Sequence, residues 1–90
     1  SLRLPFIKEH NVVCGLNSNS LSFIQDLWSR QTQVVVIENA AHNSLLTKVR
    51  SLGVHVIIGD PSDESILKAA NVGKASYFIA FSENDQDTCR

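Results

Sequence analysis

Four short runs of apolar, mostly β-branched residues alternate with segments whose apolar residues recur every three or four positions. The apolar runs lie at about 11–14, 33–37, 54–58 and 77–81. The helical patterns cover about 18–30, 45–52, and a third stretch from the turn at 60–63 to about 70. Strands that alternate with helices over short connections predict parallel pairing through right-handed crossovers. The sequence therefore predicts an α/β fold.

The character of the strands refines this prediction. The run at 34–37 is apolar without interruption, which is typical of a strand buried on both faces of a parallel sheet. The first and third runs look similarly buried. We expect a Rossmann-like parallel sheet in the order 3-2-1-4 with helices on both faces. Within the turn at 60–63, Ser62 or Asp63 is expected to cap the third helix.

The C-terminal segment at 82–90 has the capping residues and acids of a helix start but no helix body, so we expect a truncated domain. Ninety residues suffice for one small domain.

Composition excludes several function classes. A net charge of -1 gives no electrostatic reason to expect nucleic acid or an anionic membrane as partner. The apolar runs are far shorter than the roughly 20 residues that span a bilayer. Cys14 and Cys89 form no C-x-x-C pair and the histidines show no metal-ligand spacing, so we expect no metal site and a reducing cytoplasm. No nucleophile and base stand in a recognisable pattern, so we expect no catalytic residues and no enzyme.

The loop after the first strand is where a dinucleotide-binding domain carries G-x-G-x-x-G. Here the three glycine positions are Gly15, Asn17 and Ser20. Gly15 suits the tight turn, but the Asn17 side chain takes space that phosphates would use. Ser20 adds a hydroxymethyl group where the helix should approach the sheet. The pattern favours a polar turn that caps a helix, with phosphate binding at the helix N-terminus as the alternative.

Glu38 ends the second strand at roughly the distance from Gly15, about 20 residues, at which a dinucleotide site places an acid for the ribose hydroxyls. The alternative is a solvated acid at a strand end. The spacing supports the fold more than it supports binding.

Taken together, these residues resemble the RCK domain, also called the TrkA N-terminal domain, a family that regulates potassium conductance in channels and transporters. The resemblance covers residues 10–88. Its strongest part is a G-D-x-[ST]-D turn at 59–63, followed by L-x-x-A-x-[IV] at 67–72 and an alanine, Ala75, before the fourth strand.

The resemblance implies a domain organisation and a cellular setting. Residues 1–9 would be a linker, and 10–90 a Rossmann-like domain without the two further strands that family domains carry. Such a domain is cytoplasmic and is attached to, or associated with, a potassium channel or transporter of the cell membrane. It forms homo-oligomers and transmits ligand binding to a membrane pore-forming domain or subunit.

The resemblance also implies site residues. In family members with an intact glycine loop the ligand is often NAD(H), ATP or ADP. Carried over by position, Gly15, Asn17 and Ser20 would face the phosphates, Glu38 the ribose and Asp60 the adenine end, with Ser82 beside the cleft. Because two of the three glycine positions differ, we expect no tightly bound cofactor. The predicted function is that of a regulatory gating domain with a degenerate dinucleotide-binding loop.

Two other functions stay open at this point. One is an RCK domain that still senses NAD, ADP or ATP. The other is the NAD-binding fragment of an oxidoreductase, which would need a substrate domain with a catalytic base.

Overall fold

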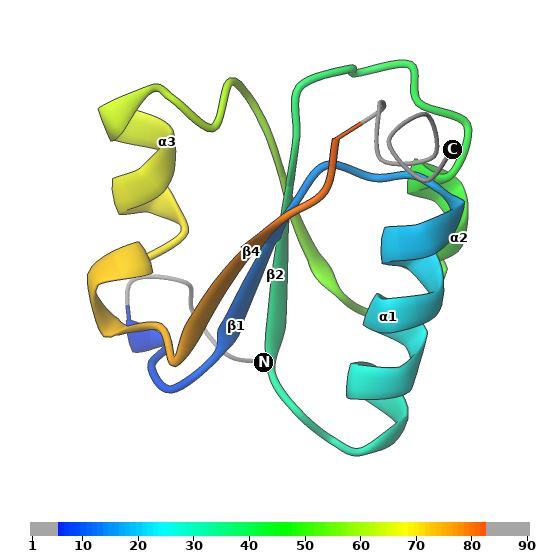
Figure 1. Cartoon of the computed structure of the whole chain (residues 1–90), viewed down its shortest axis with the longest axis horizontal. Helices are drawn as coiled ribbons and strands as arrows, with labels where there is room; N and C mark the ends of the chain where they lie inside the picture. Colours follow the sequence, from blue (N-terminus) through cyan, green and yellow to red (C-terminus); the bar gives the residue numbers. More distant parts are fainter. Residues whose placement is uncertain (1–5, 83–90) are drawn as a thin grey trace, which may run out of the picture.

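The structure is a computed structural model that describes residues 6–82 (Figure 1). Its centre is a four-stranded sheet in which every neighbouring pair of strands is parallel. The strands are β1 (Asn11–Cys14), β2 (Val34–Glu38), β3 (His55–Ile58) and β4 (Tyr77–Ala80). Their order is β3-β2-β1-β4, which confirms the predicted Rossmann-like topology.

Helices cover both faces of the sheet. Helices α1 (Ser18–Ser29) and α2 (Leu46–Ser51) lie on one face, and α3 (Glu64–Ala69) with the 3-10 helix η2 (Val72–Lys74) lies on the other (Figure 1). None of the helices described is long and apolar enough to cross a membrane.

The two central strands supply most of the core, because alternate side chains point to opposite faces of a sheet. Val13, Val34 and Val36 pack with α1 and α2 on one face. Val12, Val35, Ile37 and Cys14 form the second cluster, which α3 covers. Four consecutive β2 side chains, at 34–37, are fully buried, as expected for a strand with helices on both sides.

The prediction of a buried third strand is wrong. The residues of β3 are half-buried, and Ile58 is 36% exposed. The reason is its place in the sheet: among the strands described, β3 pairs with β2 alone and lies at an edge. Apolar composition alone does not distinguish an edge strand of this kind from a central one.

Part of the predicted N-terminal linker packs against the domain. Ile7 is buried in the core cluster beneath α3. The Asn71 side chain donates a hydrogen bond to the Ile7 carbonyl, and the Glu9 amide donates to the Lys74 carbonyl at 2.8 Å. The segment before β1 is thereby tied to the corner where α3 turns into η2.

The turn before α3 behaves as predicted, with Asp63 as the N-cap. Its carboxylate accepts a hydrogen bond from the Ser65 amide at 2.9 Å. The helix start expected at 82–90 lies outside the described residues, apart from Ser82.

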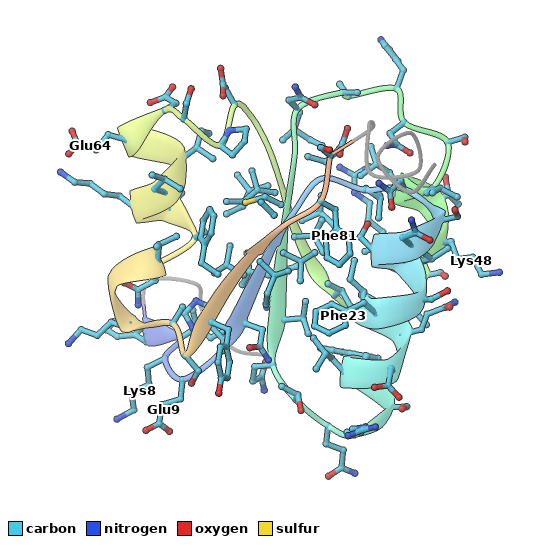
Figure 2. The ribbon with its side chains drawn as sticks, viewed as in Figure 1. Lys8, Glu9, Phe23, Lys48, Glu64 and Phe81 are labelled. Atoms are coloured by element: carbon cyan, nitrogen blue, oxygen red, sulfur yellow. The ribbon has the colours of Figure 1, made fainter. Side chains whose placement is uncertain are left out.

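The end of β4 is held against α1. The rings of Phe23, on α1, and Phe81, just after β4, lie together with their centroids 5.8 Å apart (Figure 2). This contact and the pairing of β4 with β1 place the residues that follow β4 beside the loop between β1 and α1.

Candidate functional site

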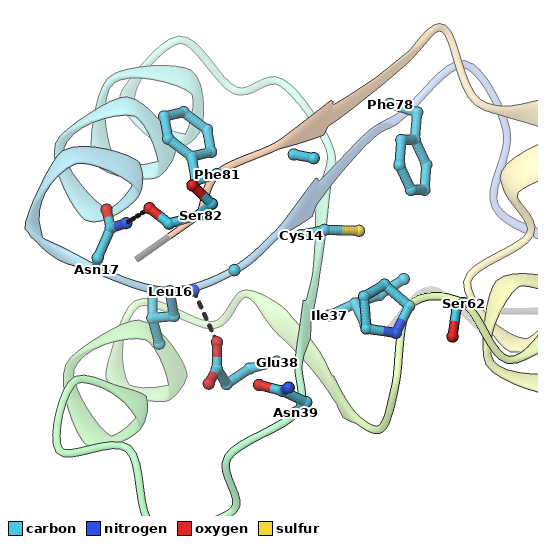
Figure 3. A pocket seen from close by; sticks show the side chains of 13 residues that line it. Cys14, Leu16, Asn17, Ile37, Glu38, Asn39, Ser62, Phe78, Phe81 and Ser82 are labelled. Carbon is cyan, nitrogen blue, oxygen red and sulfur yellow. Dashed lines mark hydrogen bonds between the residues drawn. The ribbon is translucent and has the colours of Figure 1, made fainter. Parts of the chain in front are cut away.

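A cavity of about 500 Å³ opens at the carboxyl ends of β1, β2 and β4 (Figure 3). The direction of strand order reverses between β1 and β4, and open α/β sheets bind ligands at such a point. The cavity has an apolar base made by Cys14, Ile37, Phe78 and Ala80. Its polar surroundings come from the β1–α1 loop, the end of β2, the turn before α3 and the residues after β4.

Gly15 holds the β1–α1 loop in a conformation that suits only glycine. Its φ is +90°, in the left-handed region that other residues avoid. A Cβ at this position would also overlap the carbonyl oxygen of Phe81. The first glycine of the expected loop is therefore required by the turn and by the close approach of the chain after β4.

Asn17 and Ser20 form a capping box at the start of α1. The Asn17 side chain accepts from the Ser20 amide at 2.9 Å, and the Ser20 hydroxyl accepts from the Asn17 amide at 2.9 Å. Ser20 is fully buried and does not line the cavity. Asn17 does line it, and its side-chain nitrogen Nδ2 donates to the Ser82 carbonyl at 3.2 Å (Figure 3). These contacts match the polar capping turn that the sequence favoured.

Glu38 lines the cavity, but its carboxylate already accepts hydrogen bonds from backbone amides of the protein. One oxygen accepts from the Leu16 amide at 2.7 Å (Figure 3), and the other accepts from the Ala40 amide at 3.0 Å. The residue is 5% exposed, so the alternative of a solvated acid is wrong. Glu38 joins the end of β2 to the glycine loop.

Asp60 lies outside the cavity lining, and its neighbours Pro61 and Ser62 take part instead. Its exposed carboxylate accepts from the Ser62 amide at 2.9 Å and from the Ser62 hydroxyl at 2.8 Å. These two hydrogen bonds hold the pKa of Asp60 below its usual value, the backbone bond having the larger effect. Ser82, by contrast, lines the cavity as the resemblance implied.

Several lining residues were not predicted. Phe78 and Ala80 belong to the site because they are in register with Val12 and Cys14. Strand alternation could have placed them on one face, but only the pairing partner shows that this face borders the cavity.

Burial raises the pKa of the Cys14 thiol to about 11, so the thiol is neutral at physiological pH.

Histidines take no part in the cavity lining. His10 is fully buried, and its Nε2 lies 2.8 Å from the Ala70 carbonyl oxygen. Within residues 6–82, no group of three or more His, Cys, Asp or Glu side chains is arranged to hold a metal ion.

Comparison with known proteins agrees with this geometry. The model of the TrkA-N domain family matches residues 11–90. The chain belongs to the TrkA-N domain family. It is 34% identical over 82 residues to the voltage-gated potassium channel Kch of Escherichia coli K12, a match that covers 89% of this chain and 20% of Kch. The chain therefore spans about a fifth of the length of that relative.

The fold is also that of a solved TrkA-N domain. The crystal structure of the TrkA-N domain of the Escherichia coli inner membrane protein YbaL superimposes with a TM-score of 0.77 at 22% identity. The match covers 92% of this chain and 60% of that one. The predicted family and fold are thus confirmed.

Among the described residues that line the cavity, Glu38 is the one acidic residue, and none is Lys or Arg. Lys8 and Lys48 point outward from the molecule (Figure 2). An anionic ligand in the cavity would lie near the Glu38 side chain, with no Lys or Arg in the part of the lining that the structure describes.

Proposed function

We propose that this TrkA-N domain is a cytoplasmic gating domain of a potassium channel or transporter, in which dinucleotide binding is weak. The match to Kch along 89% of the chain supports the connection to potassium conductance. The observation that carries the second part is the state of the glycine loop at positions 15–20, in which most backbone amides already donate hydrogen bonds within the protein.

Dinucleotide phosphates bind this fold through backbone amides of the loop and helix start. Four of the six amides at positions 15–20 already donate to protein acceptors. Their acceptors are the Ile37 carbonyl for Gly15, the Glu38 carboxylate for Leu16, the Ser20 hydroxyl for Asn17 and the Asn17 side chain for Ser20. Ser18 and Asn19 do not line the cavity. Phosphate binding in the cavity would therefore require the loop to exchange internal bonds for ligand bonds.

The lining residues that the structure describes form no catalytic arrangement. The Cys14 thiol is held neutral by burial, and no histidine stands beside it to act as a base. These features support a binding and regulatory role rather than that of an oxidoreductase fragment.

Potassium flux tests the gating role. The complete polypeptide that carries this domain would be reconstituted in lipid vesicles, with and without residues 10–90. A gating domain changes the potassium flux at fixed membrane potential when it is removed. A matched pair avoids the truncation: Gly15→Ala disturbs the loop, whereas Gly73→Ala adds a Cβ that meets nothing within 4 Å. Flux that is absent, or that neither the deletion nor Gly15→Ala alters, would contradict the proposal.

A second candidate is a TrkA-N domain that still senses NAD, ADP or ATP. The open cavity at the strand-order reversal, with Gly15 and Glu38 in place, favours it. Calorimetric titration with NADH, ATP and ADP separates the two. If dinucleotide binding is weak, the affinity should be high-micromolar at best. Sub-micromolar binding that disappears in Glu38→Ala would instead establish a domain that still senses nucleotides.

We further propose that the domain forms homo-oligomers beneath a membrane pore. Among the described strands, β4 pairs only with β1 and leaves one edge open. Tyr77 is 69% exposed and Phe78 is 45% exposed on that strand. An open edge with apolar side chains invites pairing with another chain.

A further inference from the structure

The segment before β1 is attached to the domain at the end of α3 that lies away from the cavity. We propose that Asn71 is a positioning residue for gating, which holds residues 6–10 on the corner between α3 and η2. Through α3, this attachment connects the cavity to the chain before β1. This inference rests on the proposed function, because it names the contact that carries a change at the cavity to that chain.

The attachment is made of three hydrogen bonds and one buried side chain. The bonds join Ile7 to Asn71, Glu9 to Lys74 and His10 to Ala70. The Ile7 side chain is 2% exposed and belongs to the apolar cluster that α3 covers. These three bonding partners lie within positions 70–74, so the segment is fixed to the end of α3 and to η2.

The identity of residue 71 suits this attachment in two respects. Its φ is +54°, in the left-handed region that asparagine tolerates better than most residues. Its side-chain nitrogen Nδ2 also donates to the Ile7 carbonyl, an oxygen that can only accept. Glycine would keep the backbone conformation and lose the donor, and an aspartate carboxylate would present an acceptor to an acceptor. Asparagine therefore combines the backbone conformation and the hydrogen-bond donor that this corner uses.

Helix α3 joins the cavity to the corner. Pro61 and Ser62, which line the cavity, directly precede its N-cap Asp63. Its other end leads into Asn71 after six helical residues, a length of about 9 Å. In Figure 1, α3 and η2 run along one side of the molecule, from the turn after β3 to the segment before β1. A ligand that displaces the turn at 61–62 would therefore shift the corner that holds the segment.

Amide hydrogen exchange of the 90-residue chain tests the attachment. In Asn71→Gly, the Glu9 amide should exchange on the order of fivefold faster, as expected for the loss of one neighbouring hydrogen bond. The Gly15 amide, which is bonded to β2, should keep its protection because the fold remains. Gly73→Ala is the matched control, since it alters η2 and its Cβ meets nothing within 4 Å. Equal exchange at Glu9 in the parent chain and both variants would overturn the inference.

A second variant distinguishes the hydrogen bond from a general loss of stability. In Asn71→Asp the side chain keeps its size and its tolerance of a left-handed backbone. At neutral pH its carboxylate cannot donate to the Ile7 carbonyl, so Glu9 should lose protection as in Asn71→Gly. At about pH 3, below the usual pKa of about 3.9 for aspartate, the protonated acid regains a donor. Protection at Glu9 should then recover relative to Asn71→Gly at the same pH, and a lack of recovery would contradict a role for this bond.

The connection through α3 has a test of its own. Asp63→Ala removes the cap at the end of the helix nearest the cavity, so it should also raise exchange at Glu9, beside the opposite end. The increase should be smaller when Asn71→Gly has already opened the attachment, as expected for coupled positions. Additive effects of the two substitutions, or no effect of Asp63→Ala on Glu9, would overturn the connection.

Potassium flux of the complete polypeptide separates this inference from the proposed function. Asn71→Gly should change the flux in the same direction as removal of residues 10–90, and Gly73→Ala should leave it at the parent level. A parent-level flux in Asn71→Gly, combined with faster exchange at Glu9, would overturn the inference. The gating role is judged separately, by the effect of the deletion, so each of the two can fail without the other.

Discussion

Gly15→Ala should be the most damaging single-methyl change in this domain. An alanine in the left-handed region costs about 1–2 kcal/mol. The new Cβ would overlap the Phe81 carbonyl oxygen and lie 3.1 Å from the carbonyl carbon, so the backbone after β4 must move away. That movement breaks the 2.7 Å bond from the Phe81 amide to the Cys14 carbonyl and disturbs the Asn17–Ser82 bond, each worth about 1 kcal/mol.

The sum is a loss of about 3–4 kcal/mol in the free energy of unfolding. Proteins of this size are typically stable by roughly 5–13 kcal/mol, at about 0.05–0.15 kcal/mol per residue. The variant should therefore fold, with a clearly lower urea midpoint. Equilibrium urea unfolding followed by far-UV circular dichroism measures the difference.

Substitutions at two other glycines distinguish the cost of backbone strain from the cost of steric overlap. Gly53 has φ +95°, but its added Cβ would meet only the Trp28 side chain, at an ordinary 3.5 Å. Gly53→Ala should thus lose only the strain, about 1–2 kcal/mol. Gly73→Ala meets nothing within 4 Å and should change stability by less than about 0.5 kcal/mol. If Gly15→Ala were no worse than Gly53→Ala, the close approach of Phe81 would not constrain the loop and the argument would be refuted.

Three further predictions concern other parts of the chain. Because the folded state raises the pKa of Cys14 from 9.0 to about 11, the stabilisation that this thiol contributes is complete below about pH 9 and is lost as the pH rises toward 11. Urea midpoints across that window should fall less in Cys14→Ala than in the parent chain, and equal slopes would contradict the assignment. Asp63→Ala should lower stability by about 1 kcal/mol through loss of the α3 cap, whereas Asp63→Ser should largely retain it; an unchanged urea midpoint in Asp63→Ala would mean that the cap contributes nothing. Sedimentation equilibrium at tens of micromolar should find a dimer or larger species that Tyr77→Lys weakens, and a clean monomer would rule out pairing through the β4 edge.

Much of the fold could be predicted because its rules are local. The run at 34–37 is buried on both faces because nothing but apolar side chains occurs there, and alternating strands and helices leave few arrangements of a parallel sheet. Residue type and position predicted a cap at Ser62 or Asp63, and the structure shows that it is Asp63. The burial of β3 could not be predicted in the same way, because it depends on which strands lie beside it.

The site was harder to predict because its bonds join distant segments. Glu38 and Leu16 are 22 positions apart, and the sequence gives no sign that one will satisfy the amide of the other. The residues after β4 meet the glycine loop from still further away, 65 positions in the case of Asn17 and Ser82. The capping box could have been predicted, because an asparagine three residues before a serine has the spacing of that motif.

The residues that replace the second and third glycines, Asn17 and Ser20, also explain why the loop forms internal hydrogen bonds. Glycines at positions 17 and 20 would have no side chains to satisfy the helix-start amides, which would then be available to a ligand. Asn17 and Ser20 satisfy those amides from within the loop, and the Asn17 side chain also binds the chain after β4. The same substitutions therefore lower the affinity expected for phosphates and stabilise the ligand-free loop. These bonds hold the β1–α1 loop in its conformation without a nucleotide, so a regulatory ligand in the cavity would either leave them intact or replace them with bonds of its own.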